Sequence, residues 1–309
     1  MNQYQTKYPC TFWSRRKVME TLATAALTGV STNTLFAQDS YPSKPINLIV
    51  PYPPGGNNDI VARAYAVPLS KAIGQPVVVD NKGGAAGAIG VGQAAKSASD
   101  GYNMVIGDLG TLCINPIANP SLSYVTLRDF TPISTIASVS IVITGRKDLP
   151  VNNLREFLNL AKSNPGQMTY GSSGIGSTQH LAGALFSKIA GISMNHVPYK
   201  GSGQAIVDLL GGQITMNFDT LPPNLQQIRQ GNLKALAIST PKRLPLLPNV
   251  PTFNEVGIVG FDVTNWYSVM GPKNMDPVVV NKIDQAVKAA MNDSEIKKTD
   301  RKSTRLNSS

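Results

Sequence analysis

Residues 46–59 read INLIVPYPPGGNND and indicate how this chain of 309 residues folds. The run Ile46–Val50 has the length and the apolar composition of a buried strand. A glycine-rich turn follows, and then Asn58 or Asp59, either of which can cap a helix at its amino end. A strand, a tight turn and a helix in this order begin a βαβ unit, so the stretch predicts an α/β fold with a mainly parallel sheet.

Short apolar runs and helical stretches alternate along the rest of the chain. We expect strands at 77–79, 104–106, 168–170, 197–199, 214–218 and 235–238, an extended segment at 261–270, and helices at 154–161, 177–190, 204–210, 224–230 and 277–291. In the helix after residue 59, Pro68 is expected to produce a kink, because it removes the hydrogen bond to the carbonyl of Ala64. The face that this helix buries is predicted to contain Ile60, Ala64, Pro68 and Ala72, with Val61 and Leu69 beside them.

Two such arrays, joined by extended segments, predict two lobes between which the chain crosses twice. We assign residues 38–140 and 260–299 to lobe I and residues 141–259 to lobe II. Hydrophobic residues make up 42% of the chain and charged residues 15%, so each lobe has enough apolar side chains for a core of its own.

The formal net charge of +10 first suggests an anionic polymer as the partner. Much of this charge lies at the two ends of the chain, and residues 38–299 contain 21 basic and 16 acidic residues. The remaining excess forms no basic run and is not interleaved with aromatic residues. Nucleic-acid binding is therefore not expected.

The first 37 residues have the organisation of an export signal. Three basic residues at 15–17 precede a stretch of mostly apolar or small residues at 22–36, and Ala37 is a plausible cleavage point. We expect a signal peptide at 1–37, cleaved near Ala37, and hence a periplasmic protein. The two arginines also resemble a twin-arginine signal, so the twin-arginine and the general secretion routes both stay open.

The last ten residues, DRKSTRLNSS, differ in composition from the helix before them. They match the translation of a common sequencing-library adapter in one reading frame, and we expect residues 300–309 to be a non-native tail. Lobe I would then lack part of its native carboxy-terminal region. The alternative is a native polar tail without regular structure, which such a composition also produces.

Two loops share one design, in which a strand leads through a glycine-rich turn into a helix that starts with small polar residues. They are residues 51–59 and 171–178. Glycine lets the backbone approach a ligand closely, and the helix beyond it offers unpaired N–H groups and a partial positive charge. Two such loops facing one cleft predict an anion site without Arg or Lys, in which a carboxylate is held from both sides. The alternative is that each loop is only a tight turn.

The sequence does not favour an enzyme. Neither loop has the spacing G-x-G-x-x-G, neither is followed by the lysine of a phosphate-binding loop, and no serine lies in G-x-S-x-G. The two histidines, His180 and His196, have no spacing typical of metal ligands, and we expect packing or a local hydrogen bond for each. Cys113 is the one thiol outside the signal peptide, and we interpret it as a packing residue. We therefore expect no catalytic residue, no metal and no cofactor.

Asp108 and Asp219 lie at the ends of predicted strands, where the binding sites of α/β sheets gather. Either carboxylate can accept a hydrogen bond from a hydroxyl or an ammonium group of a ligand, or it can cap a turn. The sequence leaves both alternatives open.

A series of short stretches, taken in chain order, has the pattern of one known family. They are INLIVPYPPGG at 46–56 with Asp59, GQPVVV at 74–79, DGY at 100–102, STQHLAG at 177–183, HVPYKG at 196–201, DLLGGQ at 208–213, FD at 218–219, LA at 236–237 and PNVPT at 248–252. From about residue 42 to residue 299 the chain resembles the extracytoplasmic solute receptors of tripartite tricarboxylate transporters, also called Bug receptors. So many motifs in one order are highly specific.

The resemblance implies a two-lobed periplasmic binding protein of the type II, Venus-flytrap kind, in which helices flank a mainly parallel sheet in each lobe. It implies a monomer that closes on a small organic carboxylate and delivers it to the large and the small membrane subunits of a transporter. The ligand-binding residues predicted from the loops and the resemblance are Tyr52, Pro54, Gly55, Gly56, Asn57, Asn58, Asp108, Thr111, Ser172, Gly174, Ser177, Thr178, Gln179 and Asp219. The alternatives are a receptor that serves a membrane sensor kinase and an enzyme on a similar scaffold.

Overall fold

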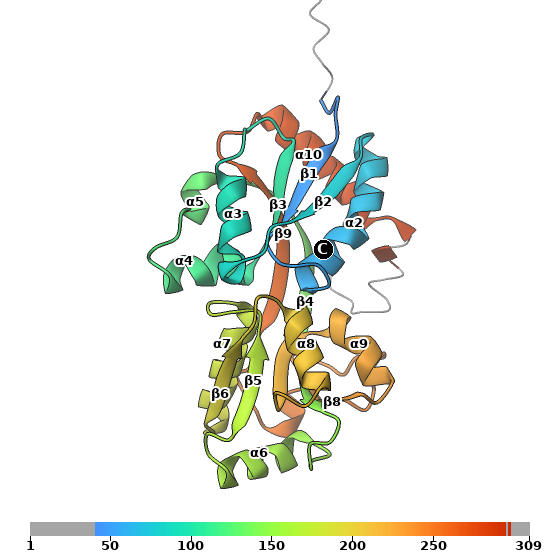
Figure 1. Ribbon diagram of the computed structural model, residues 1–309. Helices are drawn as coiled ribbons and strands as arrows, with labels where there is room; N and C mark the ends of the chain where they lie inside the picture. The colour runs from blue at the N-terminus through green and yellow to red at the C-terminus, as the bar shows by residue number, and fades with distance from the viewer. Residues whose placement is uncertain (1–40, 295, 298–309) are drawn as a thin grey trace, which may run out of the picture. The chain divides into compact units, whose positions relative to one another are not determined.

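The computed structural model describes residues 41–294, 296 and 297 (Figure 1). The predicted signal peptide at 1–37, its cleavage point at Ala37 and the predicted tail at 300–309 lie outside these residues. Within the described part of the chain, no helix has the length and apolar character needed to cross a membrane.

Strands and helices alternate over most of the described chain, as the sequence predicts. The strands are β1 (Ile46–Val50), β2 (Val77–Asn81), β3 (Asn103–Asp108), β4 (Phe130–Arg146), β5 (Met168–Ser172), β6 (Met194–Pro198), β7 (Met216–Thr220), β8 (Leu233–Ile238) and β9 (Thr264–Pro272). The helices are α2 (Asn57–Ile73), α3 (Ala88–Ala95), α4 (Asn115–Ala118), α5 (Thr126–Asp129), α6 (Leu154–Ser163), α7 (Thr178–Ala190), α8 (Ser202–Leu210), α9 (Leu221–Arg229) and α10 (Pro277–Met291). Short helical turns lie at η1 (Ala85–Gly87), η2 (Gly110–Ile114) and η3 (Asn254–Val256).

The strands form two sheets that share β4. The first sheet has the order β2-β1-β3-β9-β4, and in the second β4 pairs with β7 and β8 while β5 and β6 extend the sheet beyond β7. Strands β2, β1 and β3 are parallel, and so are β7, β5 and β6, as expected for βαβ units. The pairs that involve β4 or β9 are antiparallel.

Strand β4 changes its partners half-way along its 17 residues. The part from Phe130 to Ser140 pairs with β9, whereas the part from Ile141 to Arg146 pairs with β7 and β8. No strand is predicted over either part of β4, and in the first part Ser and Thr interrupt the apolar residues. Figure 1 shows β4 and β9 running between the upper and the lower group of elements.

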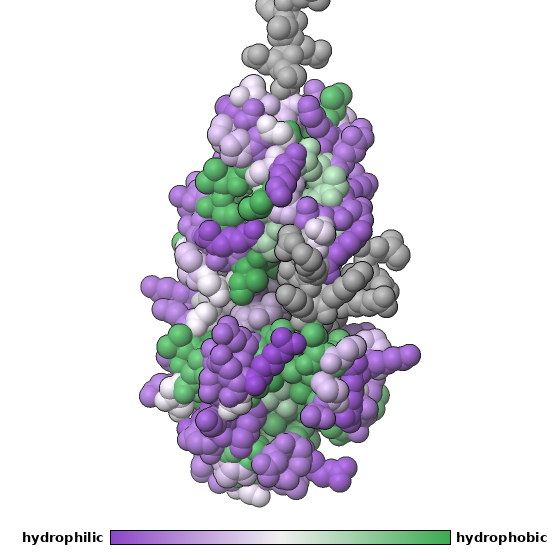
Figure 2. Space-filling model, turned by 90° about the vertical axis from the view of Figure 1, so that its right-hand side faces the viewer, coloured by the Kyte–Doolittle hydropathy of each residue, from purple (hydrophilic) through white to green (hydrophobic). Residues whose placement is uncertain are grey.

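Each sheet packs against helices of its own and has a separate apolar core. In the upper lobe α2 and α10 cover β1 and β3, and in the lower lobe α6 and α7 cover β5 and β7. The two main clusters of buried side chains have no residue in common. On the face shown in Figure 2, hydrophilic residues are interspersed with hydrophobic patches. The described chain therefore has the predicted two-lobed α/β architecture.

Helix α2 differs from its prediction. Its N-cap is Gly56 rather than Asn58 or Asp59. Of the predicted buried face, Val61, Pro68 and Leu69 are buried, Ile60 and Ala64 are half-buried and Ala72 is exposed. The buried face also contains Ala62, Tyr65, Ala66 and Ile73. The buried face is displaced because α10 packs against α2 in addition to the sheet.

Three smaller differences concern other segments. The Gly- and Ala-rich stretch after β2 contains α3, which the sequence analysis does not predict. Strand β6 starts at Met194 and β7 at Met216, a few residues from their predicted positions. Cys113 is exposed, so its interpretation as a packing residue is wrong; it lies in η2, where a turn of helix alternates buried and exposed positions.

The aromatic core of the lower lobe provides a test of the fold. Phe186 is fully buried, and its ring lies 5.2 Å from that of Phe218 and 6.1 Å from that of Phe253, measured between centroids. We expect Phe186→Ala to lower the free energy of unfolding by about 3–5 kcal/mol, because the cavity it leaves cannot refill completely. Leu127→Ala is the control, since this side chain is 97% exposed. Urea unfolding curves that give the two variants equal stability would contradict the assignment.

Candidate functional site

The first glycine-rich loop connects β1 to α2. Gly55 has a φ of +82°, which residues with a Cβ rarely adopt, and Gly56 is the N-cap of the helix. The carboxylate of Asp59 accepts a hydrogen bond from the Gly55 N–H at 2.9 Å and pairs with Arg63 at 2.9 Å. The first turn of α2 therefore holds the loop in place.

The second glycine-rich loop connects β5 to α7. Gly174 and Gly176 have φ values of +118° and +86°. Ser172 Oγ accepts a hydrogen bond from the Gly174 N–H at 3.0 Å and closes the turn. A Cβ added to Gly174 would lie 3.2 Å from the Cβ of Ala86 in η1, so this loop packs closely against the upper lobe.

Asn57 connects the two lobes. Its side-chain nitrogen donates to Asp219 Oδ1 at 2.5 Å, and its side-chain oxygen accepts from the hydroxyl of Thr220. Its backbone N–H donates to Ser202 Oγ, at the start of α8, at 3.4 Å. The amino end of α2 is thus bonded to β7 and to α8 of the lower lobe.

Asp219 is the acceptor around which this junction is arranged. Besides Asn57, it receives hydrogen bonds from Gln179 Nε2 at 3.2 Å, the Thr220 N–H at 2.8 Å and Asn224 Nδ2 at 3.2 Å. Burial raises the pKa of Asp219, and these donors oppose the rise. Its role in the structure is to align side chains from both lobes.

Asp108 lies at the end of β3 and is also buried. Its Oδ1 accepts from the N–H and from the hydroxyl of Thr111, each at 2.8 Å. Burial raises the pKa of Asp108, and hydrogen bonds from Thr111 and from the side chains of Asn265 and Asn58 oppose the rise. The charge of Asp108 contributes to a raised pKa in both Tyr52 and Tyr267, after the larger effect of burial, so both phenols lie near it.

The amino end of α7 contacts β9. Thr178 Oγ1 donates to Asn265 Oδ1 at 3.0 Å, and Asn265 Nδ2 donates to the hydroxyl of Tyr267 at 3.0 Å. One donor close to this network makes no hydrogen bond of good geometry among the described residues: Asn58 Nδ2 is buried, and its amide lies near enough to Asp108 to oppose the rise in the pKa of that carboxyl. An unpaired buried amide is costly, and a ligand oxygen would satisfy it.

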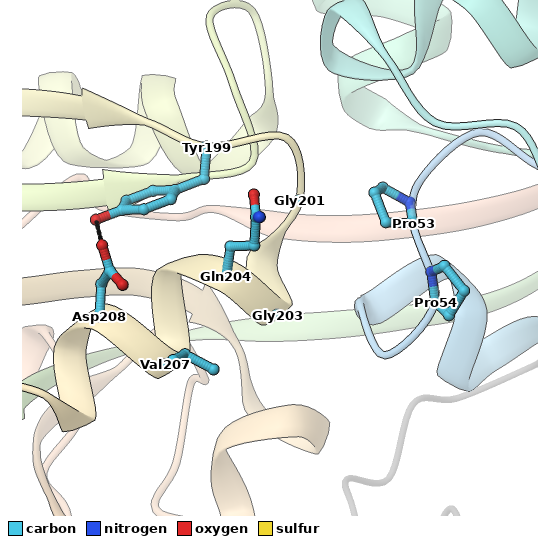
Figure 3. Close-up of a pocket in the computed structure, with 8 residues that line it drawn as sticks. All are labelled: Pro53, Pro54, Tyr199, Gly201, Gly203, Gln204, Val207 and Asp208. Atoms are coloured by element: carbon cyan, nitrogen blue, oxygen red, sulfur yellow. Dashed lines mark hydrogen bonds between the residues drawn. The ribbon is translucent and has the colours of Figure 1, made fainter.

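Two hollows flank the buried polar region. Figure 3 shows one of about 530 Å³, which lies between the first loop and α8 and is lined by Pro53, Pro54, Tyr199, Gly201, Gly203, Gln204, Val207 and Asp208. Within it the Tyr199 hydroxyl donates to Asp208 Oδ2 at 2.7 Å. The other, of about 600 Å³, lies between η2, α7 and the start of β9, and Trp266 and Leu185 contribute to its lining.

This arrangement suits recognition of an anion. The described residues include no group of three or more His, Cys, Asp or Glu side chains placed to hold a metal ion. What they do include is two helix amino ends, α2 and α7, together with neutral side-chain donors. Such ends carry a partial positive charge and unpaired N–H groups that favour an anion.

Comparison with known proteins identifies the family. Residues 61–304 match the family described as "Tripartite tricarboxylate transporter family receptor". The chain belongs to this family. Protein BugT of Bordetella pertussis is 39% identical to it over 254 residues, which cover 82% of this chain and 78% of BugT.

Three solved structures share its fold and have sequence identities of 29% or more to it. The periplasmic binding protein BugD is 35% identical with a TM-score of 0.82, covering 85% of this chain and 87% of BugD. MatC (Rpa3494) from Rhodopseudomonas palustris with bound malate is 29% identical with a TM-score of 0.81, covering 85% and 90%. R. palustris Rpa4515 with adipate is 33% identical with a TM-score of 0.82, covering 84% and 87%.

Membership of this receptor family confirms two expectations from the sequence. The chain is a solute-binding receptor of the tripartite tricarboxylate transporter type, and it is not an enzyme. The fold comparison confirms the two-lobed periplasmic binding protein architecture.

All of the predicted ligand-binding residues except Pro54 and Gly55 are buried. The buried ones are Tyr52, Gly56, Asn57, Asn58, Asp108, Thr111, Ser172, Gly174, Ser177, Thr178, Gln179 and Asp219. Hydrogen bonds connect Asn57 and Gln179 through Asp219, and Thr111 to Asp108. The predicted ligand contacts of all these residues stay predictions.

The hydroxyl groups of Ser172 and Ser177 make hydrogen bonds within their own loop and the helix that follows it. Ser177 Oγ caps α7 by accepting from the His180 N–H at 3.2 Å. Ser172 Oγ lies 2.6 Å from His196 Nε2. Their hydroxyl groups therefore shape the backbone that faces the junction.

Five residues that complete the polar network were not predicted as part of the site. They are Ser202, Thr220, Asn224, Asn265 and Tyr267. Thr220 follows Asp219 directly and Ser202 follows the glycine that starts α8, so a wider search around the motifs would have found both. Asn265 and Tyr267 carry no such signal, because only the pairing of β9 with β3 and β4 brings them to the site.

The two histidines pack against each other and make hydrogen bonds to the second loop. Their rings stack with centroids 4.2 Å apart and an interplanar angle of 29°. His180 Nδ1 accepts from the Gly176 N–H at 3.3 Å, and His196 bonds to Ser172. Burial, and then the neighbouring His180, lower the pKa of His196 to about 4, and burial lowers the pKa of His180. The expected local hydrogen bonds are confirmed.

These shifts predict how stability depends on pH. Because the pKa of His196 is about 4 in the folded protein and about 6.5 in an unfolded chain, the unfolded state binds more protons between these values. The free energy of unfolding should therefore be complete above about pH 6.5 and decrease as the pH falls towards 4. We expect a loss of about 1–2 kcal/mol, since water around the partly exposed rings screens part of the effect.

The measurement is urea unfolding at pH 4.5 and pH 7 on the native protein and on His196→Gln. The variant cannot titrate at this position, so its stability should change less between the two pH values. An equal change in both proteins would show that other groups cause it.

Proposed function

We propose that this protein is a periplasmic receptor that binds a small organic carboxylate between its lobes and delivers it to the large and small membrane subunits of a tripartite tricarboxylate-type transporter. One observation carries the proposal: two glycine-rich loops, each leading into a helix, converge on a polar region without a buried Lys or Arg among the described residues. Similarity to receptors whose structures contain malate and adipate supports the same class of ligand.

The chemistry of binding follows from the two helix ends. A carboxylate between them accepts hydrogen bonds from the first N–H groups of α2 and α7, which have no partner within their own helix. Asn58 Nδ2 supplies a further donor from a buried position. Three to five such bonds, each worth about 1.5–3 kcal/mol, are sufficient for a micromolar dissociation constant, which corresponds to about −8 kcal/mol.

The lobes provide the means of closure. We assign residues 38–140 and 260–299 to lobe I and residues 141–259 to lobe II; the change of partners of β4 after Ser140 and the start of β9 at Thr264 support these limits. Opening about β4 and β9 would break the bonds of Asn57 to the lower lobe and admit the ligand. Closure would form them again around it.

Export and delivery complete the proposal. The predicted signal peptide at 1–37 would bring the protein to the periplasm, where it acts as a monomer and meets the membrane subunits. A receptor for a sensor kinase would bind the same ligand without uptake. Loss of uptake of that ligand in a strain without this gene would support the transporter role, and unchanged uptake would contradict it.

Ligand binding is tested by thermal stability. A carboxylate at 100 times its dissociation constant should stabilise the folded protein by about 2.7 kcal/mol and raise its melting temperature by several degrees. Malate, adipate and a wider panel of small organic acids are the probes, and the corresponding amides are the controls. A cooperatively unfolding protein that none of the acids stabilises would contradict the proposed function.

Asn58 provides a test of the site itself. Asn58→Leu keeps the shape of the side chain but removes the buried donor, so it should weaken binding of a carboxylate about tenfold or more. The stability of the free protein is measured as well, because the Asn58 amide also opposes the raised pKa of Asp108 and its loss can destabilise the folded protein.

Calorimetric titration and urea unfolding measure the two effects of this substitution. Cys113→Ala is the control, because this exposed thiol has no place in the proposed site. If Asn58→Leu binds the carboxylate with unchanged affinity, Asn58 does not contact the ligand.

A further inference from the structure

The amide of Asn57 has both of its polar atoms bonded to the opposite lobe. Asn57 lies in the first turn of α2 and is 5% exposed. Its Nδ2 donates to Asp219 Oδ1 at 2.5 Å, and its Oδ1 accepts from the hydroxyl of Thr220, both at the end of β7. These bonds join protein groups only, so they stabilise the contact between the lobes whatever lies between them.

The acceptor of this contact is held in place by its own lobe. Asp219 is fully buried. It receives hydrogen bonds from Gln179 at 3.2 Å, from the Thr220 N–H at 2.8 Å and from Asn224 at 3.2 Å, and all three donors belong to the lower lobe. No ion pair found among the described residues includes Asp219, and a hydrogen bond to a charged acceptor is stronger than one between neutral groups. The donor from Asn57 is therefore the part of this network that depends on closure of the lobes.

The backbones on the two sides of the contact approach each other closely beside Asn57. A Cβ added to Gly201 would lie 3.2 Å from Pro53 Cδ, which is tighter than an ordinary contact. The Asn57 N–H donates to Ser202 Oγ at 3.4 Å. Figure 3 shows Pro53 and Pro54 of the first loop on one side of the hollow and the start of α8 on the other. Because Gly201 has no side chain, the first loop can reach the start of α8, and this places Asn57 against β7.

We propose that Asn57 is a positioning residue that latches the two lobes together, with and without a ligand, and does not contact the ligand itself. The inference rests on the proposed function, in which the ligand lies between the lobes. The observed affinity of such a receptor is its intrinsic affinity reduced by the fraction of molecules in the closed, binding-competent arrangement. Because the latch raises this fraction for every ligand alike, it strengthens the binding of all acids by one factor and selects none of them.

Binding of several acids to Asn57→Ala measures this factor. The probes are malate, adipate and every acid of the thermal panel that stabilises the native protein, titrated by calorimetry. The dissociation constants should rise about tenfold or more, as expected for loss of a hydrogen bond to a charged acceptor, and the factors for different acids should agree within about threefold. Asn281→Ala is the matched control, because this asparagine is exposed on α10 and bonds to Gln285 of the same helix. It should bind each acid as the native protein does.

Small-angle X-ray scattering of the ligand-free proteins measures the latch directly. Asn57→Ala should have a larger radius of gyration than the native protein and Asn281→Ala, because its lobes open more often. Gly201→Val opens the lobes by another route: the φ of −177° at Gly201 is extended backbone that valine adopts, but the added side chain presses on Pro53. It should expand the ligand-free protein in the same way.

Thr220→Val separates the latch from a defect of folding. Valine has the shape of threonine but lacks the hydroxyl that donates to Asn57 Oδ1. Alone, this substitution should weaken binding of each acid about threefold, and it should add little to Asn57→Ala, because the bond they share is already lost. If Asn57→Ala shows no cooperative unfolding in urea, Thr220→Val provides the binding measurement and Gly201→Val the scattering measurement.

The outcomes separate this inference from the function on which it rests. An unchanged radius of gyration in ligand-free Asn57→Ala would overturn the latch and leave carboxylate binding intact. So would factors that differ between acids by more than about threefold, because a residue that contacts the ligand discriminates between ligands. If no acid binds to the native protein, the proposed function fails, and the scattering of the ligand-free proteins still decides whether the latch exists.

Discussion

The hydrogen bonds of β4 join both sheets, and the relative position of the two glycine-rich loops depends on them. The first part of this strand belongs to the sheet of β1 and β3, and its second part to the sheet of β7 and β5. Because β1 leads into one glycine-rich loop and β5 into the other, a single continuous strand determines how the two loops face each other. In the proposed closure, rotation about β4 and β9 opens the site while each lobe keeps its own core.

The second constraint is electrostatic. Buried polar groups have to be paired, and this protein pairs them with amides, hydroxyls and helix ends instead of with cations. Such donors can hold a single carboxylate without a counter-ion, but they cannot neutralise several. Asp108 is paired in the same way, by Thr111 and by the side chains of Asn265 and Asn58.

Much of the fold was predictable from local patterns, and the errors have physical causes. Helix α10 was predicted with its observed limits, because these depend on local features. Asp276 caps the helix, Pro277 is its first residue, and its apolar positions recur with the helical period. The buried face of α2 was correct at Val61, Pro68 and Leu69 but wrong at Ala72, because α10, more than 200 residues away in the chain, also covers this helix. Strand β4 was missed along its whole length; the side chains of its first part are partly polar, and only its pairing with β9 makes that part a strand.

The sequence by itself determined the two glycine-rich loops, the family and most of the candidate ligand-binding residues. These depend on short-range chemistry: glycine is needed where φ is positive, and Ser or Asn where a helix begins. Only the tertiary structure decided what each polar side chain does. It showed that Asp219 receives donors from both lobes, that Asp108 receives two hydrogen bonds from Thr111, and that both histidines hydrogen-bond to the second loop. Hydrogen-bond partners far apart in the chain are chosen by the packing of whole elements, which no local pattern records.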